Sequence, residues 1–409
     1  MASFALKKLF FSSFIRFKRS CLAIIKNILL FKKPKSLSSN HTILVFKVGG
    51  LGDFVLGIPA LNLLRKHLPN SSIFLVTAKS LNNLPVKYTG HDPHDVSSLP
   101  WVSLVRDSIN GVLVVHDLSF KTINKISALI PSSEKTVVFI LGYPGMVFSS
   151  ALKKILFARL LTRRSASCFG TDKVLDDRFM RNFQKDQKLS KHKMLGDIES
   201  IMEGFPGSIY TEKDIDFHVS ITSSAKLSSN EKIGSKRMQN IILVAPIATT
   251  EHKQWPLENY VQLLKNLTRN DGSHPFVIIG TPDHFDIVNQ LFQNVEFDIQ
   301  NLCGKLSIQE LAALLSVAKG YIGNDGGMSH LASLVGCPSV IVFNSVEEDS
   351  VTYPWRSLSG VVRNYTDCSP CYNPLYCPKL HRRCVTDIAI EAVQRRVIEI
   401  ICNSSNQIL

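Results

Sequence analysis

Short apolar runs alternate with segments of helical period over most of the chain. Four runs in the first half are short and continuous, as in strands buried on both faces of a parallel sheet; they cover residues 43–48, 73–77, 112–115 and 137–141. Residues 53–67 have a helical period that ends before Pro69, and residues 191–203 form a second such segment. This alternation of strands and helices predicts an α/β domain.

The same alternation begins again after residues 206–240, a polar stretch rich in serine and lysine. Further strands are predicted at 241–245, 276–279, 321–323 and 339–343, and helices at 257–267, 283–292, 308–317, 328–335 and 388–401. We therefore predict two doubly wound domains that face each other across a cleft, with ligands at the carboxyl ends of the strands. The predicted boundaries are 1–40 for a leader with its linker, 41–220 for the N-terminal domain, 221–240 for the inter-domain linker, 241–385 for the C-terminal domain and 386–409 for a C-terminal helix and tail.

The composition is that of a folded protein, and its positive charge is unevenly distributed. Of the 409 residues, 45% are apolar and 20% are charged, which excludes a disordered, collagen-like or disulfide-scaffold chain. Residues 1–35 contain nine lysines and arginines and no acidic residue, so they account for nine of the fourteen net positive charges. The rest of the chain is only weakly basic, and we expect no nucleic-acid partner for it.

The leader has an amphipathic pattern. On a helical wheel its basic residues share one side, and the apolar side chains Phe10, Phe14, Phe17, Ile24 and Ile28 lie mostly opposite. This pattern is typical of a helix that lies on an anionic membrane surface, and a solvated leader with no membrane role is the alternative. No stretch reaches the ~20 apolar residues of a transmembrane helix. Nine cysteines, five of them scattered, indicate a reducing compartment, so we expect a cytoplasmic protein.

Residues 47–53 (KVGGLGD) join the first strand to the first helix. Glycines at such a junction let the backbone approach a ligand, and the start of a helix favours an anion. The spacing is that of neither a dinucleotide-binding motif nor a P-loop. Asp53 is therefore either the N-cap of the helix or a carboxylate that takes part in chemistry.

Two further loops follow strands of the second domain. Residues 249–256 (TTEHKQWP) place two hydroxyls and a lysine at a strand end, where they could hold a phosphate, or they form a surface turn with a tryptophan packed on the core. In residues 323–330 (GNDGGMSH), amides of a glycine-rich helix start could cradle a diphosphate. Asp325 stands where it could bind a sugar hydroxyl. His330, one turn into the helix, is either structural or part of this site.

Four cysteines fall within 17 residues near the C-terminus: Cys368, Cys371, Cys377 and Cys384. Four thiolates can hold a structural zinc ion or an iron–sulfur cluster. The spacing is not that of a standard zinc ribbon, which has two separated C-x2-C knuckles. A structural metal and a set of reduced, packed thiols both remain open.

Taken in order, these segments resemble glycosyltransferase family 9, the ADP-heptose:lipopolysaccharide heptosyltransferases. The resemblance extends over about residues 41–400 and rests on residues 43–53 (ILVFKVGGLGD), 58–61 (IPAL), 249–256, 323–332 (GNDGGMSHLA) and 368–371 (CSPC). It implies a GT-B architecture of two Rossmann-like domains, the first for the acceptor and the second for the nucleotide sugar. It also implies inversion at the anomeric carbon without a metal cofactor, on a lipid-linked acceptor at the cytoplasmic face of the inner membrane.

The resemblance also implies roles for individual residues. Asp53 corresponds to the base that deprotonates the acceptor hydroxyl, and Lys253 to the cation that stabilises the departing diphosphate. Residues implied in donor binding are Thr249, Thr250, Asp283, Asp325, His330 and the amides of Gly326, Gly327 and Met328. Lys47, Gly50 and Gly52 belong to the loop on the acceptor side. No cofactor is required for catalysis, and zinc at the four cysteines would be structural only.

The chain departs from the family pattern at two loops. The family commonly has Ser-Ser where Gly49 and Gly50 stand, and Gly-Pro-Thr where this chain has residues 344–346 (NSV). The second departure lies near the donor site, so a transferase that uses another nucleotide sugar for a different surface polysaccharide is one alternative. A non-catalytic nucleotide-sugar-binding protein is the other. The presence of both Asp53 and Lys253 argues against the second alternative, because a binding protein needs no base.

Overall fold

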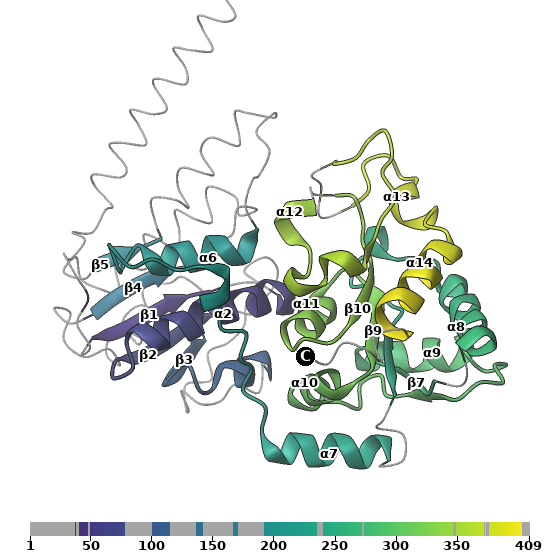
Figure 1. The fold of residues 1–409 in the computed structure, drawn as a ribbon, viewed down its shortest axis with the longest axis horizontal. Helices are drawn as coiled ribbons and strands as arrows, with labels where there is room; N and C mark the ends of the chain where they lie inside the picture. Colours follow the sequence, from purple (N-terminus) through teal and green to yellow (C-terminus); the bar gives the residue numbers. More distant parts are fainter. Residues whose placement is uncertain are drawn as a thin grey trace, which may run out of the picture.

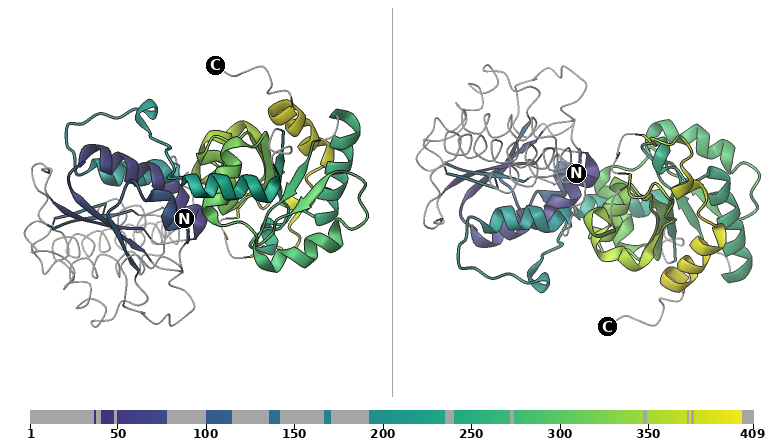
Figure 2. Two further views of the ribbon diagram at one scale, coloured as in Figure 1. Left: turned by 90° about the horizontal axis from the view of Figure 1, so that it is seen from below. Right: turned by 90° about the horizontal axis from the view of Figure 1, so that it is seen from above.

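The computed structural model describes residues 41–47, 50–77, 100–114, 136–141, 167–170, 192–234, 240–271, 274–346, 349–371 and 376–402, together with Leu37 and Asn373. The predicted amphipathic leader, residues 1–35, lies outside this part of the chain. The described residues form two lobes, each built around its own sheet (Figures 1 and 2). None of the described helices is both long enough and apolar enough to cross a membrane.

The N-terminal lobe contains a parallel five-stranded sheet of order β3-β2-β1-β4-β5. Its elements are β1 (Thr42–Phe46), α2 (Leu51–His67), β2 (Ser72–Thr77), the 3-10 turn η1 (Pro100–Val105), β3 (Gly111–Val114), β4 (Thr136–Ile140), β5 (Ser167–Phe169), α6 (Lys193–Met202) and the turn η3 (Glu212–Asp214). The four predicted strands and both predicted helices are confirmed. Helix α2 begins two residues earlier than predicted, and β5 was not predicted.

The C-terminal lobe contains a parallel six-stranded sheet of order β11-β10-β9-β6-β7-β8. Its elements are β6 (Ile242–Ala245), η4 (Glu251–Lys253), α8 (Leu257–Asp271), β7 (Phe276–Ile278), η5 (Pro282–His284), α9 (Phe285–Leu291), β8 (Ile299–Asn301), α10 (Ile308–Val317), β9 (Gly320–Asn324), α11 (Gly327–Leu334), β10 (Ser339–Val342), α12 (Asp349–Thr352), η6 (Trp355–Gly360), β11 (Val361–Val362), α13 (Arg383–Thr386), α14 (Ile390–Val397) and the π-helical turn η7 (Ile398–Cys402). The predicted strands and helices are present, whereas β8 and β11 were not predicted.

Strand β6 shows why continuous apolar runs form the centre of this sheet. Leu243 belongs to the core on the side of α10 and α11, and Ile242 and Val244 belong to the core on the side of α8 and α14. Both faces of the strand are therefore covered by helices. A strand covered on both sides needs apolar residues at every position, because its side chains alternate between two buried faces.

Two parts of the predicted domain plan differ from the structure. The segment predicted as a linker contains a helix, α7 (Ser223–Ile233), which packs against α10 of the C-terminal lobe. Residues 386–402, predicted as part of a separate helix and tail, pack into the C-terminal core, where Val393, Val397 and Ile401 are buried. These residues belong structurally to the C-terminal lobe.

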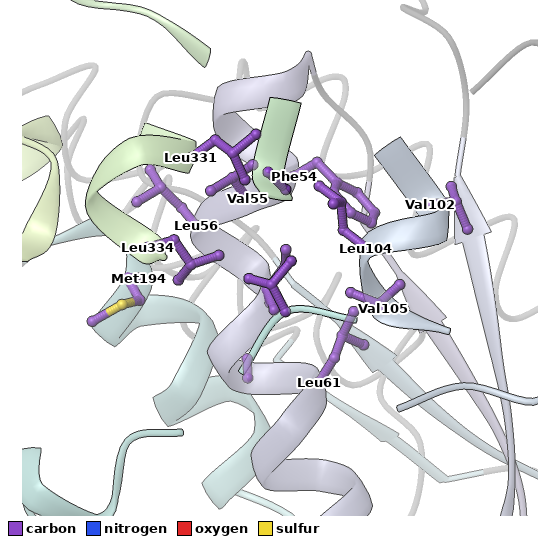
Figure 3. Packing of buried hydrophobic residues seen from close by; sticks show 14 of the residues in the cluster. Phe54, Val55, Leu56, Leu61, Val102, Leu104, Val105, Met194, Leu331 and Leu334 are labelled. Atoms are coloured by element: carbon purple, nitrogen blue, oxygen red, sulfur yellow. The ribbon is translucent and has the colours of Figure 1, made fainter. Parts of the chain in front are cut away.

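One apolar core extends from the N-terminal lobe into the C-terminal lobe. Figure 3 shows side chains of α2 against side chains of α11, with Met194 of α6 beside them. The residues at this contact are Phe54, Val55, Leu56, Leu331 and Leu334, all of them buried. The two lobes thus meet through a closely packed interface at the N-terminal half of α2.

Candidate functional site

The order of strands locates a crevice in each lobe. In the N-terminal sheet the chain reverses its direction of winding between β1 and β4, and in the C-terminal sheet between β6 and β9. In open parallel sheets, ligands bind at the carboxyl ends of the strands at such switch points. The glycine-rich loop before α2 follows β1, and the loops that carry Lys253 and Asp325 follow β6 and β9. Three of the four predicted motifs therefore lie at these edges.

The starts of α2 and α11 meet at the interface between the lobes. A Cβ atom added to Gly52 would lie 3.0 Å from Cδ2 of His330, and one added to Gly327 would lie 2.8 Å from Cβ of Leu51. Any larger side chain at either position would push the two helices apart, which explains the glycines. Asp53, half-buried in the first turn of α2, is thereby held near His330 of the other lobe.

Gly50, not Asp53, is the N-cap of α2, and it has no side chain to cap the helix. The alternative interpretation of Asp53 as the N-cap is therefore wrong. Asp53 instead lies in the first turn, where a carboxylate is favoured by the positive end of the helix dipole.

An ion pair forms the centre of the C-terminal side. Nζ of Lys253 lies 2.5 Å from Oδ2 of Asp325, whose side chain is 6% exposed, whereas that of Lys253 is 28% exposed. Burial by itself raises the pKa of a carboxyl group, but Lys253 and His330 beside it hold the pKa of Asp325 below its usual range. Asp325 is therefore an anion at neutral pH, and the pair places one negative and one positive charge at the β6–β9 switch point.

His330 lies between this pair and the start of α2. Its Nε2 is 4.0 Å from Oδ1 of Asp325, and its buried Nδ1 has no hydrogen-bond partner among the described residues. Burial lowers the pKa of His330 to about 4, against the opposing effect of Asp325. The ring is therefore neutral at neutral pH, and it lies beside both the Asp325 carboxylate and Gly52 of the other lobe.

The loop after β6 contains two more buried polar atoms without a partner in the described part of the chain. They are Oγ1 of Thr250 and Nε2 of His252, and the neighbouring Thr249 is exposed. Most buried polar groups in folded proteins are hydrogen-bonded. A ligand bound at this edge of the sheet could form the hydrogen bonds that these two polar atoms lack.

Gln254 and Trp255 fix the conformation of this loop. The Gln254 side chain accepts a hydrogen bond from the Ala248 amide and donates one to the Pro246 carbonyl, both at 2.7 Å. Trp255 is fully buried, and its amide donates to Oδ1 of Asn324 at 3.1 Å. The prediction of a tryptophan packed on the core is confirmed, although this packing also joins the Lys253 loop to the residue preceding Asp325.

Other predicted residues have different surroundings from those expected. Lys47 is 3% exposed and forms a buried ion pair with Asp197 of α6, so it is not on an open loop. The amide of Gly326, predicted to be available for a phosphate, donates to Oγ of Ser329 at 3.1 Å. The amides of Gly327 and Met328 belong to the first turn of α11, where no intrahelical carbonyl reaches them. Asp283 is exposed at the end of β7, beside the strand that leads to Lys253.

The structure adds one residue that the sequence reasoning missed. His192, at the N-cap of α6, donates through Nε2 to the carbonyl of Tyr353 at 2.7 Å and packs against the rings of Tyr353 and Trp355. Burial lowers the pKa of His192 to about 4, so the ring is neutral. This contact joins the two lobes. The only signal in the sequence is a histidine directly before an apolar helix, which is too common to indicate this role.

The four clustered cysteines do not form a metal site in the described structure. All four are free thiols of intermediate exposure, and burial together with the neighbouring thiols raises the pKa of Cys384. Among the described residues, no three His, Cys, Asp or Glu side chains are arranged so that they could hold a metal ion. The described geometry thus does not fit the predicted structural zinc.

Comparisons with known proteins show which family and fold the chain resembles. Residues 178–376 match the family model described as glycosyltransferase family 9 (heptosyltransferase). A lipopolysaccharide core heptosyltransferase, OpsX of Haemophilus influenzae, is 25% identical over 126 residues, which are 31% of this chain and 36% of that protein. The match therefore spans about a third of the relative's length.

Two solved structures have the same fold. A family 9 glycosyltransferase of Veillonella parvula has a TM-score of 0.63 at 16% identity and covers 90% of this chain and 100% of its own. The ADP-heptose lipopolysaccharide heptosyltransferase II of E. coli has a TM-score of 0.59 at 17% identity and covers 88% of this chain and 98% of its own. These likenesses confirm the predicted GT-B fold. The family model matches nearly half of the chain, which is therefore similar to glycosyltransferase family 9.

Proposed function

We propose that the protein is an inverting glycosyltransferase that transfers a heptose from ADP-heptose to a lipid-linked saccharide of the lipopolysaccharide core. One observation carries the proposal. Asp53 lies in the first turn of α2, Asp325 lies just before α11, the starts of these two helices meet at Gly52 and Gly327, and Lys253 pairs with Asp325. A base on one lobe opposite a cation and a carboxylate on the other is the arrangement that transfer between two bound substrates requires.

In the proposed reaction, the acceptor hydroxyl oxygen attacks the anomeric carbon of the sugar from the side opposite the diphosphate. The bond between that carbon and the diphosphate oxygen breaks, and the hydroxyl proton passes to Asp53. Because a sugar hydroxyl is a weak nucleophile, removal of this proton lowers the barrier. Attack from the opposite face inverts the anomeric configuration.

The departing ADP gains negative charge, which the C-terminal lobe would stabilise. Lys253 is partly exposed and can turn from Asp325 to the diphosphate, and the amides of Gly327 and Met328 add the positive end of a helix. Thr249 and Thr250 would bind phosphate oxygens. These groups replace a metal ion as the source of positive charge, so the proposed reaction needs no metal cofactor.

Asp325 would bind hydroxyls of the donor sugar, and His330 beside it would hold that carboxylate in place. Asp283, at the end of β7, would reach the ribose of the nucleoside. Gly50 and Gly52 would admit the acceptor close to Asp53. We assign no contact with substrate to Lys47, because its buried pair with Asp197 keeps it below the loop.

The proposed location is the cytoplasmic face of the inner membrane, with residues 1–35 on the anionic lipid surface. The lipid-linked acceptor is presented at that surface, so attachment would concentrate the enzyme at its substrate. A transferase that uses a different nucleotide sugar is the second candidate, and the unusual residues 344–346 favour considering it.

Replacement of Asp53 tests the proposed function. We expect Asp53→Asn to bind ADP-heptose with unchanged affinity in calorimetry and to lose about 10²- to 10⁴-fold in turnover, because the amide cannot take the proton. Turnover is measured as ADP release with mass spectrometry of the product. Wild-type turnover in this variant would show that Asp53 is not the base. Absence of transfer by the wild-type protein, with nucleotide-sugar binding intact, would instead favour a non-catalytic binding protein.

A further inference from the structure

The loop that follows β10 is buried, like the start of the loop after β9 and unlike residues that follow β6 and β7 at the same edge of the C-terminal sheet. Residues 344–346 stand where the family commonly has Gly-Pro-Thr, and all three are buried, with Asn344 2% and Ser345 1% exposed. Thr249 and Asp283, after β6 and β7, are exposed. The loop lies directly beside the site, because β10 pairs with β9 and the amide of Asp325 donates to the Val342 carbonyl at 3.1 Å.

The side chain of Asn344 is only half satisfied. Its Oδ1 accepts a hydrogen bond from the Val346 amide at 3.3 Å, which fixes the orientation of the carboxamide. Its Nδ2 is buried and has no hydrogen-bond partner within the described residues. The next residue differs, because the hydroxyl of Ser345 donates to the Asn364 carbonyl at 2.8 Å. Asn344 thus contributes an unpaired donor to an otherwise satisfied polar loop.

An unpaired buried donor is unfavourable and uncommon in folded proteins. A glycine, the residue that the family commonly has here, would avoid this cost and would leave no side chain to place. An asparagine at this edge has a physical reason if a bound ligand supplies the acceptor atom that its Nδ2 lacks. In the free protein the amide is covered, so the loop after β10 has to shift for that contact to form.

The order of strands indicates which part of the ligand the acceptor atom belongs to. From β7 through β6 to β9, the proposed function places the ribose, the diphosphate and the transferred sugar in that order. Strand β10 comes next in the sheet, on the far side of β9 from the nucleoside. A group at the end of β10 is therefore closest to the sugar.

We propose that Nδ2 of Asn344 donates a hydrogen bond to a hydroxyl oxygen of the transferred sugar, and that Asn344 is a specificity-determining residue for the donor. This inference rests on the proposed function. It adds a residue to the donor site that family resemblance alone does not give, because the family commonly has no side chain at this position.

Calorimetric titration of the full chain with ADP and with ADP-heptose tests the inference. For Asn344→Ala we expect ADP to bind with unchanged affinity and ADP-heptose to bind about 5-fold more weakly, since one neutral hydrogen bond is lost. Asn344→Asp retains an acceptor for the Val346 amide but has no donor. This variant should therefore also bind ADP-heptose more weakly, and its affinity for ADP should be normal or lower. Ser345→Ala is the matched control in the same loop and should leave both affinities unchanged.

Each other outcome overturns the inference in a distinct way. An equal loss for ADP and ADP-heptose in Asn344→Ala would assign the amide to the diphosphate. Normal ADP-heptose binding by Asn344→Asp would reduce Asn344 to a turn-forming residue, and an equal loss in Ser345→Ala would assign the effect to loosening of the loop. If the wild-type protein binds neither ADP-heptose nor another nucleotide sugar, the proposed function fails as well, whereas normal wild-type binding with unaffected variants removes only the role of Asn344.

Discussion

Removing Lys253 should destabilise the protein more than removing the charge of its partner, Asp325. In Lys253→Ala, the carboxylate of Asp325 stays 6% exposed without its principal cation. Removing one partner of a buried pair typically costs about 3–5 kcal/mol. We expect about 3 kcal/mol, the lower end, because Lys253 is 28% exposed and solvent already screens part of the ion pair.

The reverse change should cost less. In Asp325→Asn the lysine can turn to solvent, so the loss is that of a hydrogen bond to a charged group, about 1.5–3 kcal/mol at most. We expect a value near the lower end of that range. Lys253→Ala should therefore be the more destabilising variant, by about 1 kcal/mol or more.

Acid should reduce the deficit of Lys253→Ala. In the wild-type protein the pKa of Asp325 is lowered, so its stabilising effect is present above the unfolded pKa, near 4, and is lost as the pH falls further. In Lys253→Ala the effect of burial is less opposed and the folded pKa rises, so protonation relieves the cost earlier. The difference between variant and wild type should shrink between about pH 6 and pH 4.

The measurement is guanidinium unfolding followed by tryptophan fluorescence, since Trp255 lies in the same core as this loop. The control is Lys379→Ala, a change at an exposed lysine that should stay within ~0.5 kcal/mol of wild type. The reasoning is refuted if Asp325→Asn is the more destabilising variant, or if the deficit of Lys253→Ala does not change between neutral and acidic pH.

Four further predictions follow from other parts of the molecule. Hydrogen bonds from Lys232 and nearby serines outweigh the effect of burial and lower the pKa of Glu310 to about 2. Glu310→Gln should therefore lose about 2 kcal/mol of unfolding free energy in urea at pH 7, a value discounted because Lys232 is 35% exposed. This difference from wild type should vanish as the pH falls from 4.5 to 2, and a constant difference would refute the prediction. Gly327→Ala should open the contact with Leu51, lowering the melting temperature and turnover together, and unchanged turnover would show that the contact is not needed. Transfer should persist in EDTA, with circular dichroism to confirm that the four cysteines need no metal to stay folded; inactivation of a folded protein would contradict the proposed mechanism. Deletion of residues 1–38 should abolish salt-sensitive sedimentation with anionic liposomes and leave activity on a soluble acceptor fragment, whereas full sedimentation of the truncated protein would assign the membrane contact elsewhere.

The sequence by itself predicted most of the regular structure. Continuous apolar runs identified the central strands of both sheets, because strands covered on two faces need apolar residues at every position. Residues 308–317 were predicted as a helix with the bounds that the structure has, where Ser307 and Glu310 form a capping box. The three short strands β5, β8 and β11 were missed, since two or three residues are too few to show a period.

The loops with candidate chemistry could also be found from the sequence. Glycines between a strand and a helix, and a lysine or an aspartate directly after a strand, depend on local geometry that neighbouring residues determine. Asp53, Lys253 and Asp325 were therefore selected as candidates before their positions in space were known. The prediction of an N-terminal and a C-terminal domain of one architecture followed from the same alternation.

Only the tertiary structure decided what these groups contact. Helix α7 is polar on most of its surface and is held on α10 by the bonds that Ser228 and Lys232 make to Glu310, so its own sequence shows no apolar face. Lys47 is read as a loop cation until Asp197, 150 residues away in the chain, is found beside it. The cysteine spacing likewise permits a metal that the observed geometry does not fit. Partners distant in the chain leave no local pattern, because the energy of an ion pair or a packed contact depends on a distance in space that folding sets.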